Sequence, residues 1–147
     1  MLRMAVAALH LLALGIGLGA IVARARSLRA PLDASRLSGV FLADSLWGLA
    51  ALLWVTTGLW RAFGGLEKGS AFYLGSTAFW IKMTLLGLIL VLEAWPMVTL
   101  IRWRLARARG GAVDLGSAPA MSRISIAQTI LVVAMVFVAT AMARGLS

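Results

Sequence analysis

The stretch LGSTAFWIKMTLLGLILVLEAWPMVTLI, residues 74–101, decides the fold of this chain. It is apolar over more than the roughly 20 residues needed to cross the hydrocarbon core of a bilayer. Because lipid offers no hydrogen-bond partners, a segment of this kind must pair its backbone groups internally, as a helix. The stretch therefore predicts a transmembrane helix, and it contains two ionisable side chains, Lys82 and Glu93, that lipid does not explain.

Three more apolar runs of the same kind occur at residues 2–23, 40–60 and 124–142. The chain of 147 residues is 62% hydrophobic and only 13% charged, which is far too apolar for a soluble domain of this size. The runs are also too long to be the strands of about 10 residues that build a membrane barrel. We therefore expect an all-α fold, an integral membrane four-helix bundle that forms one domain over residues 1–147.

Basic residues flank the apolar runs unequally. Nine arginines lie beside the connections between the first and second runs and between the third and fourth: Arg24, Arg26, Arg29, Arg36, Arg102, Arg104, Arg107, Arg109 and Arg123. Four basic residues lie on the opposite side: Arg3, Arg61, Lys68 and Arg144. Because positively charged loops stay in the cytoplasm, this asymmetry predicts an N-out/C-out orientation in a bacterial inner membrane. The net charge of +9 then belongs to headgroup contacts, so the expected partner is the lipid bilayer and not nucleic acid.

Cysteine is absent and histidine occurs once, at position 10. The absence of cysteine excludes disulfides, thiolate nucleophiles and iron–sulfur ligation. A single histidine excludes a histidine-cluster metal site within one chain, and it makes His10 the one imidazole available to a metal.

Four ionisable side chains fall inside the apolar runs: His10, Asp44, Lys82 and Glu93. Such groups cost about 3 kcal/mol each to insert, so they face the bundle interior or water and are candidate functional residues. Their positions place His10 and Lys82 in an outer layer and Asp44 and Glu93 in an inner layer. Lys82 and Glu93 share a helix face but lie about 16 Å apart along it, too far to pair directly.

Each of these groups therefore needs a partner of its own. Asp44 and Glu93 can be satisfied by Arg24, Arg102 or another arginine at the inner end of a helix. Lys82 has no deep acid near it, so it needs a carbonyl group, water or a bound anionic ligand.

Structural explanations compete with the functional ones. Asp44 can be a charge near a helix start that interacts with the helix dipole, Lys82 can extend toward the membrane interface, and His10 can make an ordinary interhelical hydrogen bond. Glu93 is harder to explain in this way, because it lies three residues before Pro96, whose missing backbone donor can kink a helix. We treat Glu93 and Lys82 as candidate catalytic groups.

The order of these residues resembles a known group of membrane proteins. His10 in the first helix, Arg24 and Arg26 at its inner end, and the motif FWIKM at residues 79–83 are similar to features of the four-helix proteins around the J-type protoporphyrinogen oxidases and the copper-resistance D-type proteins. This resemblance implies haem b or another porphyrin as the ligand. It implies His10 as the metal ligand, and His10, Lys82, Arg24 and Arg26 as the cofactor-binding residues.

The chain departs from that pattern at a position that bears on haem binding. Where the porphyrin enzymes are expected to have a second histidine about three turns after the lysine, this sequence has Glu93. A haem with two histidine ligands from one chain is therefore impossible. A haem with one histidine ligand, a haem shared across a homodimer, and a metal-free porphyrin with its propionates on Lys82 and arginines all remain open.

A closer resemblance, over nearly the full length, rests on three other stretches: GLWR at residues 58–61, FGGLEKG at residues 63–69 and EAWPM at residues 93–97. These resemble a family of bacterial predicted membrane proteins of unknown function. The resemblance implies a four-helix membrane protein and supplies no activity.

Three functional hypotheses from different classes follow. The first is a haem- or porphyrin-binding redox protein in which His10 ligates the metal or transfers protons, Lys82 binds a propionate, and Glu93 relays protons. The second is a non-enzymatic subunit or assembly helper of a larger membrane complex, as a homodimer or with other chains. The third is a small proton-coupled transporter centred on Glu93 and Pro96.

Overall fold

The computed structural model describes residues 1–65 and 69–145. Its four long helices are α1 (Leu2–Arg29), α2 (Ala34–Phe63), α4 (Thr77–Ala108) and α5 (Ala118–Ala143). A short helix, α3 (Ser70–Leu74), precedes α4, and a 3₁₀ turn, η1 (Leu115–Ser117), precedes α5. The described residues contain no strand, so the predicted all-α fold is confirmed. Lys68, which was counted in the charge asymmetry, lies outside the described residues.

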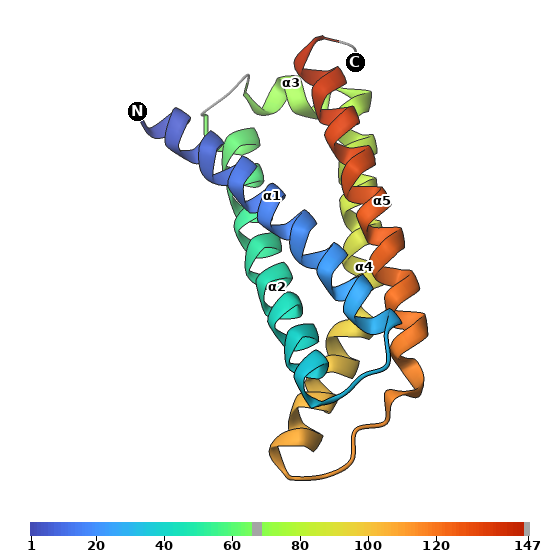
Figure 1. Cartoon of the computed structure of the whole chain (residues 1–147). Helices are drawn as coiled ribbons and strands as arrows, with labels where there is room; N and C mark the ends of the chain where they lie inside the picture. Colours follow the sequence, from blue (N-terminus) through green and yellow to red (C-terminus); the bar gives the residue numbers. More distant parts are fainter. Residues whose placement is uncertain (66–68, 146–147) are drawn as a thin grey trace.

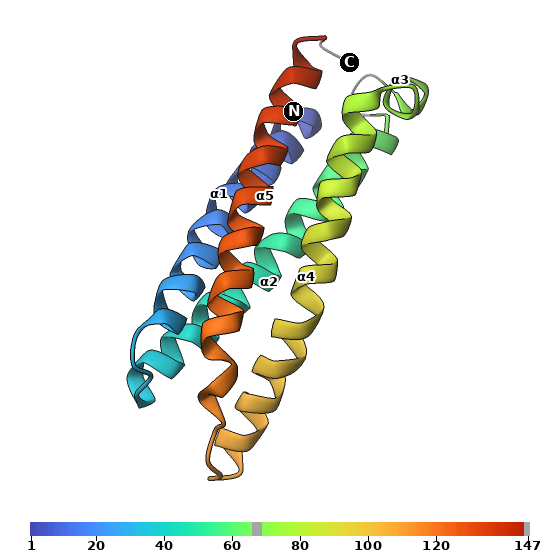
Figure 2. The same cartoon turned by 90° about the vertical axis from the view of Figure 1, so that its right-hand side faces the viewer.

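The four long helices run lengthwise between the two ends of the bundle and are inclined to one another (Figures 1 and 2). Helix α1 packs against α2 and α5, and α5 also packs against α4. Both termini and α3 lie at one end of the bundle (Figure 1), which we call the terminal end. The connections at residues 30–33 and 109–117 lie at the other end, which we call the arginine-rich end.

Every long helix extends beyond the apolar run that predicted it. Helix α1 ends at Arg29 where residue 23 was predicted, and α4 ends at Ala108 where residue 101 was predicted. The third helix was predicted to begin at residue 74, but α4 begins at Thr77, because the side chain of Ser76 caps it by accepting a hydrogen bond from the Phe79 amide. Apolar length sets what lies in lipid, whereas capping sets where a helix begins.

Asp33 caps α2 in the same way. Its carboxylate accepts hydrogen bonds from the Arg36 amide, at 2.8 Å, and from the Ser35 hydroxyl, at 3.0 Å. These two donors, the amide first, hold the pKa of Asp33 below its usual range. The second helix therefore begins at Ala34, six residues before the apolar run that predicted it.

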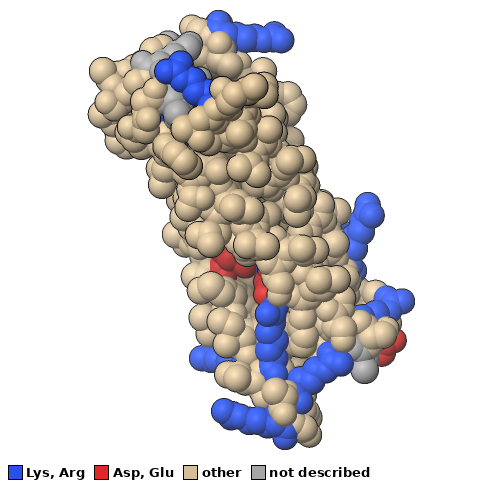
Figure 3. Space-filling model, turned by 90° about the vertical axis from the view of Figure 1, so that its left-hand side faces the viewer, with Lys and Arg blue, Asp and Glu red and all other residues tan. Residues whose placement is uncertain are grey.

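The surface of the bundle is that of a membrane protein. Each of the four long helices contains an apolar stretch long enough to span a bilayer, and large apolar side chains are exposed along all of them. Figure 3 shows basic side chains at the two ends of one face, more of them at the arginine-rich end, with a mostly uncharged band between. This arrangement confirms a helical membrane bundle.

Buried apolar side chains form two separate clusters inside the bundle. The first lies in the middle of the four long helices: Ala13, Ala20, Ile21, Trp47, Trp54, Ile89, Val132 and Met135. The second lies toward the arginine-rich end: Leu28, Leu37, Val40, Leu100, Trp103, Ala118 and Met121. On each long helix, a few residues separate the two clusters, and those residues include Arg24, Asp44, Glu93, Ser125 and Gln128.

Candidate functional site

A cavity of about 500 Å³ lies in the terminal half of the bundle. Its lining comes from all four long helices and from α3, and it includes the two residues that were predicted to share the outer layer, His10 of α1 and Lys82 of α4. Most of the lining is apolar or aromatic, with Trp54, Tyr73 and Phe79 among the rings. A volume of this size is within the range of ligand-binding pockets.

His10 is held against α2 by two features of that helix. Its Nδ1 lies 3.0 Å from the hydroxyl of Thr57, and a Cβ added to Gly58 would lie only 3.1 Å from its Cε1. The imidazole also stacks in a tilted arrangement near Trp54, with ring centroids 6.0 Å apart. The predicted interhelical hydrogen bond of His10 is therefore confirmed, and it uses only one of the two ring nitrogens.

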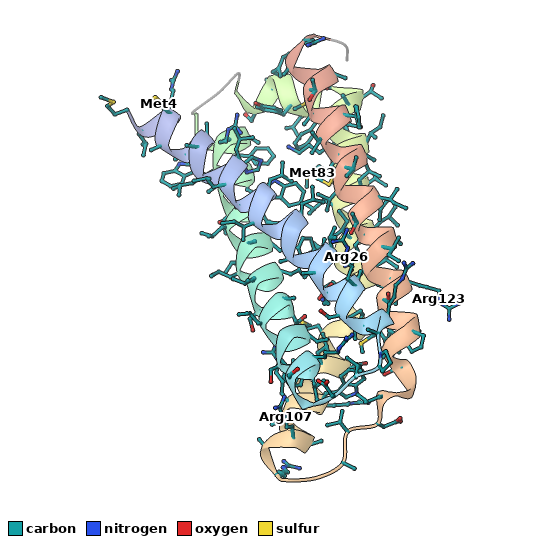
Figure 4. All side chains as sticks on the ribbon, in the orientation of Figure 1. Met4, Arg26, Met83, Arg107 and Arg123 are labelled. Atoms are coloured by element: carbon teal, nitrogen blue, oxygen red, sulfur yellow. The ribbon has the colours of Figure 1, made fainter. Side chains whose placement is uncertain are left out.

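Lys82 lines the cavity, and none of the described residues is bonded to it. Among residues 1–65 and 69–145, its ammonium group makes no hydrogen bond and no ion pair. Arg61 lines the same cavity and adds a second positive charge to it. Met83, one residue after Lys82, also belongs to the lining and lies between the helices in Figure 4. The cavity thus combines positive charge with an apolar wall.

The second polar site is an ion cluster built around Arg24, which is completely buried. Its Nη1 donates to Glu93 Oε1 at 2.7 Å and to Asp44 Oδ1 at 2.9 Å. Its Nη2 donates to Glu93 Oε2 at 2.7 Å and to Gln128 Oε1 at 3.0 Å. Its Nε donates to the Ser125 hydroxyl at 3.0 Å. All five N–H groups of the guanidinium are therefore satisfied.

The carboxylates of the cluster are themselves well supplied with donors. Asp44 accepts from Arg104 Nη2 at 2.8 Å, through the oxygen that Arg24 does not use. Glu93 accepts from the Gln128 amide at 2.8 Å, and the same amide also donates to the Ile89 carbonyl at 3.2 Å. Two arginines and two carboxylates leave the cluster with no net charge, which lowers the cost of burying it.

One structural explanation of Asp44 is corrected by this geometry. Because α2 begins at Ala34, Asp44 lies almost three turns inside the helix and is not a charge near the helix start. The prediction that Asp44 and Glu93 pair with an arginine is confirmed, with Arg24 as the shared partner. Arg102, the other named candidate, is exposed on the surface.

Sequence reasoning missed the two uncharged members of the cluster and did not single out Arg104 among the arginines at the inner end. Gln128 and Ser125 are completely buried on α5, and Arg104 reaches Asp44 from the last turns of α4. A signal for the first two is present in the sequence, because Ser122, Ser125 and Gln128 recur every three residues within an apolar run and mark one polar face of a helix.

The structure separates the predicted site residues into two groups. His10 and Lys82 share the cavity, whereas Arg24 and Glu93 meet in the ion cluster and do not line the cavity. Arg26 is exposed on α1 and belongs to neither. Residues 10 and 24 of α1 lie about 21 Å apart along the helix axis. No group of three or more histidine or acidic side chains suited to a metal occurs in the part of the chain that the structure describes.

Comparison with known proteins identifies the family without identifying an activity. A family model described as a predicted membrane protein matches residues 2–147. No curated protein and no solved structure matches the chain, so the more distant resemblance to porphyrin enzymes gains no support from these comparisons. Because the match covers nearly all of the 147 residues, the chain belongs to the DUF2214 family of predicted membrane proteins.

Proposed function

We propose that this membrane protein binds a haem, or a closely related metalloporphyrin, in the cavity of the terminal half. The observation that carries the proposal is that one cavity of about 500 Å³ is lined by both His10 and Lys82. His10 would supply a nitrogen ligand to the metal and Lys82 would pair with a propionate. Iron held there would supply one-electron redox chemistry.

The donor set of the cavity fits such a ligand. His10 Nε2 has no hydrogen-bond partner among the described residues and is not sealed off by its surroundings. Trp54 Nε1, in the wall beside it, is buried and has no partner in the described part of the chain, which leaves a spare donor there. Neutral imidazole nitrogen is a good ligand for porphyrin iron.

The distribution of charge also fits a ligand with an anionic edge. An ammonium group in an apolar wall is costly unless an acid or water reaches it, and Lys82 has no acid of the described chain bonded to it. A propionate would provide that acid. The aromatic and aliphatic side chains of the lining would cover the apolar face of the macrocycle.

In this proposal Glu93 and Arg24 have an architectural role. Both oxygens of Glu93 accept hydrogen bonds from Arg24, and one of them also accepts from Gln128. A carboxylate bound in this way joins α4 to α1 and α5. We therefore place the chemistry at His10 and Lys82 and leave proton relay by Glu93 out of the proposed function.

The test of ligation is haemin titration of the detergent-purified protein, followed by visible absorption of the oxidised and reduced forms. We expect a Soret band that shifts on reduction in the wild-type protein and is lost in His10→Ala. The proposal fails if wild-type protein shows no specific haemin spectrum, or if the spectrum and affinity are the same in His10→Ala. The comparison of wild-type protein with His10→Ala also controls for haemin that dissolves in the detergent, because both proteins carry the same micelles.

The test of the charge pair uses two variants that each remove one positive charge. Lys82→Gln is expected to weaken haemin binding by about tenfold, the equivalent of about 1.4 kcal/mol, because the propionate loses a charge-assisted partner. Arg123→Gln is the matched control, since Arg123 is exposed and points away from the bundle (Figure 4). Equal weakening in both variants would show a general charge effect and contradict a specific role for Lys82.

A further inference from the structure

The hydrogen bonds of Thr57 determine which nitrogen of His10 faces the cavity. The Thr57 hydroxyl has a single proton and three neighbours: the Leu53 carbonyl at 2.6 Å, the Trp54 carbonyl at 3.2 Å and His10 Nδ1 at 3.0 Å. Carbonyl oxygens can only accept, so the proton belongs to the shortest contact, with Leu53. The hydroxyl oxygen must then accept from His10, which requires the proton of the imidazole to lie on Nδ1.

Another feature of α2 keeps this edge of the ring in place. Gly58 leaves room for the ring, because a Cβ there would lie 3.1 Å from Cε1 and 3.7 Å from Nδ1 of His10. The Nδ1 edge of the ring is therefore fixed against α2, while Nε2 has no partner among the described residues.

We propose that Thr57 is a positioning residue that fixes His10 in its Nδ1–H tautomer, so that the lone pair of Nε2 faces the cavity before any ligand arrives. The hydrogen bond made by one imidazole nitrogen sets the state of the other. In metal sites, a second-shell partner of this kind also fixes the ring orientation and raises the basicity of the ligand atom. The inference rests on the proposed function for the identity of the ligand, but the tautomer itself can be measured without any ligand.

The chain is well suited to this measurement because His10 is its one histidine. Protein labelled with ¹⁵N-histidine and held in detergent micelles, at a pH where the imidazole is neutral, gives one pair of ring nitrogen signals. We expect a protonated Nδ1 and an unprotonated Nε2 in the wild-type protein and in Thr57→Ser, which keeps the hydroxyl. In Thr57→Val we expect a mixture of the two tautomers, because neither ring nitrogen then has a hydrogen-bond partner among the described residues. A wild-type ring with its proton on Nε2, or a Thr57→Val ring identical to wild type, overturns the inference.

Thr56→Val is the matched control. Thr56 neighbours Thr57, is exposed, and uses its hydroxyl only within α2, to the Leu52 and Leu53 carbonyls. It should leave the signals of His10 unchanged. A tautomer change of equal size in Thr56→Val would mean that loss of any threonine hydroxyl disturbs α2, and it would overturn a specific role for Thr57.

Haemin titration gives a second and separable readout. Loss of a second-shell partner typically weakens metal binding by about tenfold or more, so Thr57→Val should bind haemin about tenfold more weakly than wild type, with Thr57→Ser restoring most of the affinity. Haemin binding by a protein whose ligand-free His10 carries its proton on Nε2 would support the proposed function and overturn this inference. If the protein shows the expected tautomers but binds no haemin, the role of Thr57 is supported and the proposed function is contradicted.

Discussion

A buried arginine is tolerated in the middle of this bundle because its partners come from every neighbouring helix. Arg24 of α1 meets Asp44 of α2, Glu93 of α4, and Ser125 and Gln128 of α5. Each of these contacts is a hydrogen bond of 3.0 Å or less, and such bonds are electrostatically stronger in a protein interior than in water. The cluster therefore fixes the relative positions of four helices at one depth.

Removal of the arginine should be severe, because it leaves a carboxylate buried without its counter-charge. We expect Arg24→Met to lower the free energy of unfolding by about 3–5 kcal/mol, the range measured for breaking one side of a buried pair. Asp44 retains Arg104, so Glu93 is the stranded group. Arg24→Met combined with Glu93→Gln should therefore be more stable than Arg24→Met alone. Unfolding in mixed detergent micelles measures both.

Arg26→Met is the control for that experiment, because Arg26 lies on the same helix but is exposed. Its effect should remain within about 0.5 kcal/mol, as for most surface substitutions. A double variant that is no more stable than Arg24→Met would contradict the view that the unpaired charge of Glu93 dominates the loss.

The charged members of both sites could be predicted from the sequence, whereas their uncharged partners could not. An ionised side chain in an apolar run is expensive, so His10, Asp44, Lys82 and Glu93 stand out individually. Gln128 and Ser125 cost much less to insert and resemble ordinary packing residues until a partner is known. The pairing of His10 with Thr57 depends on the crossing of α1 and α2, which no spacing within either helix encodes.

At the scale of the elements, the crossing of α1 over α2 depends on a small residue at one point. A Cβ added to Gly17 would lie 3.3 Å from the Ala50 Cβ and 3.4 Å from the ring of Trp47. Close approach of this kind is typical of small residues at helix interfaces in membranes. It also holds α2 near enough to α1 for Thr57 to reach His10.

Gly17→Leu should therefore force the two helices apart and cost about 1–3 kcal/mol of stability, as for an overpacked core. Gly15→Leu is the matched control on the same helix, because a Cβ at Gly15 would meet nothing within 4 Å. That substitution should be neutral or slightly stabilising, since leucine has the higher helix propensity. Unfolding in mixed micelles compares the two variants, and equal destabilisation would contradict a close contact at Gly17.

The helices themselves could be predicted from apolar length, but their ends could not. The arginines that follow each apolar run are good helix formers, so α1 and α4 continue through them to Arg29 and Ala108. Helix α4 ends just before Gly110, whose φ of +71° is a conformation that favours glycine. Hydropathy contains no information on either point, which is why the predicted bounds fell short at the arginine-rich end.

At the scale of the whole molecule, the two polar sites divide the bundle by depth. The cavity with His10 and Lys82 lies toward the terminal end, and the ion cluster lies toward the arginine-rich end. The apolar cluster that contains Ile21, Ile89 and Val132 lies between them along the helices. The arginine-rich half is thus fixed by ion pairs, while the terminal half keeps the cavity of about 500 Å³.

The distribution of charge predicts how the bundle is oriented in the membrane, and this orientation decides which compartment the cavity faces. The excess of arginine at the two loops of the arginine-rich end predicts that these loops face the cytoplasm and that the termini and the cavity face outward. Because the chain has no cysteine, a single cysteine introduced at an exposed position shows on which side of the membrane that position lies. We expect Ser70→Cys, in α3 at the terminal end, to react with a membrane-impermeant maleimide in intact cells. Ala112→Cys, in the loop of the arginine-rich end, should react only after the membrane is permeabilised. The reverse pattern would place the cavity on the cytoplasmic side, where a porphyrin ligand would have to arrive from within the cell.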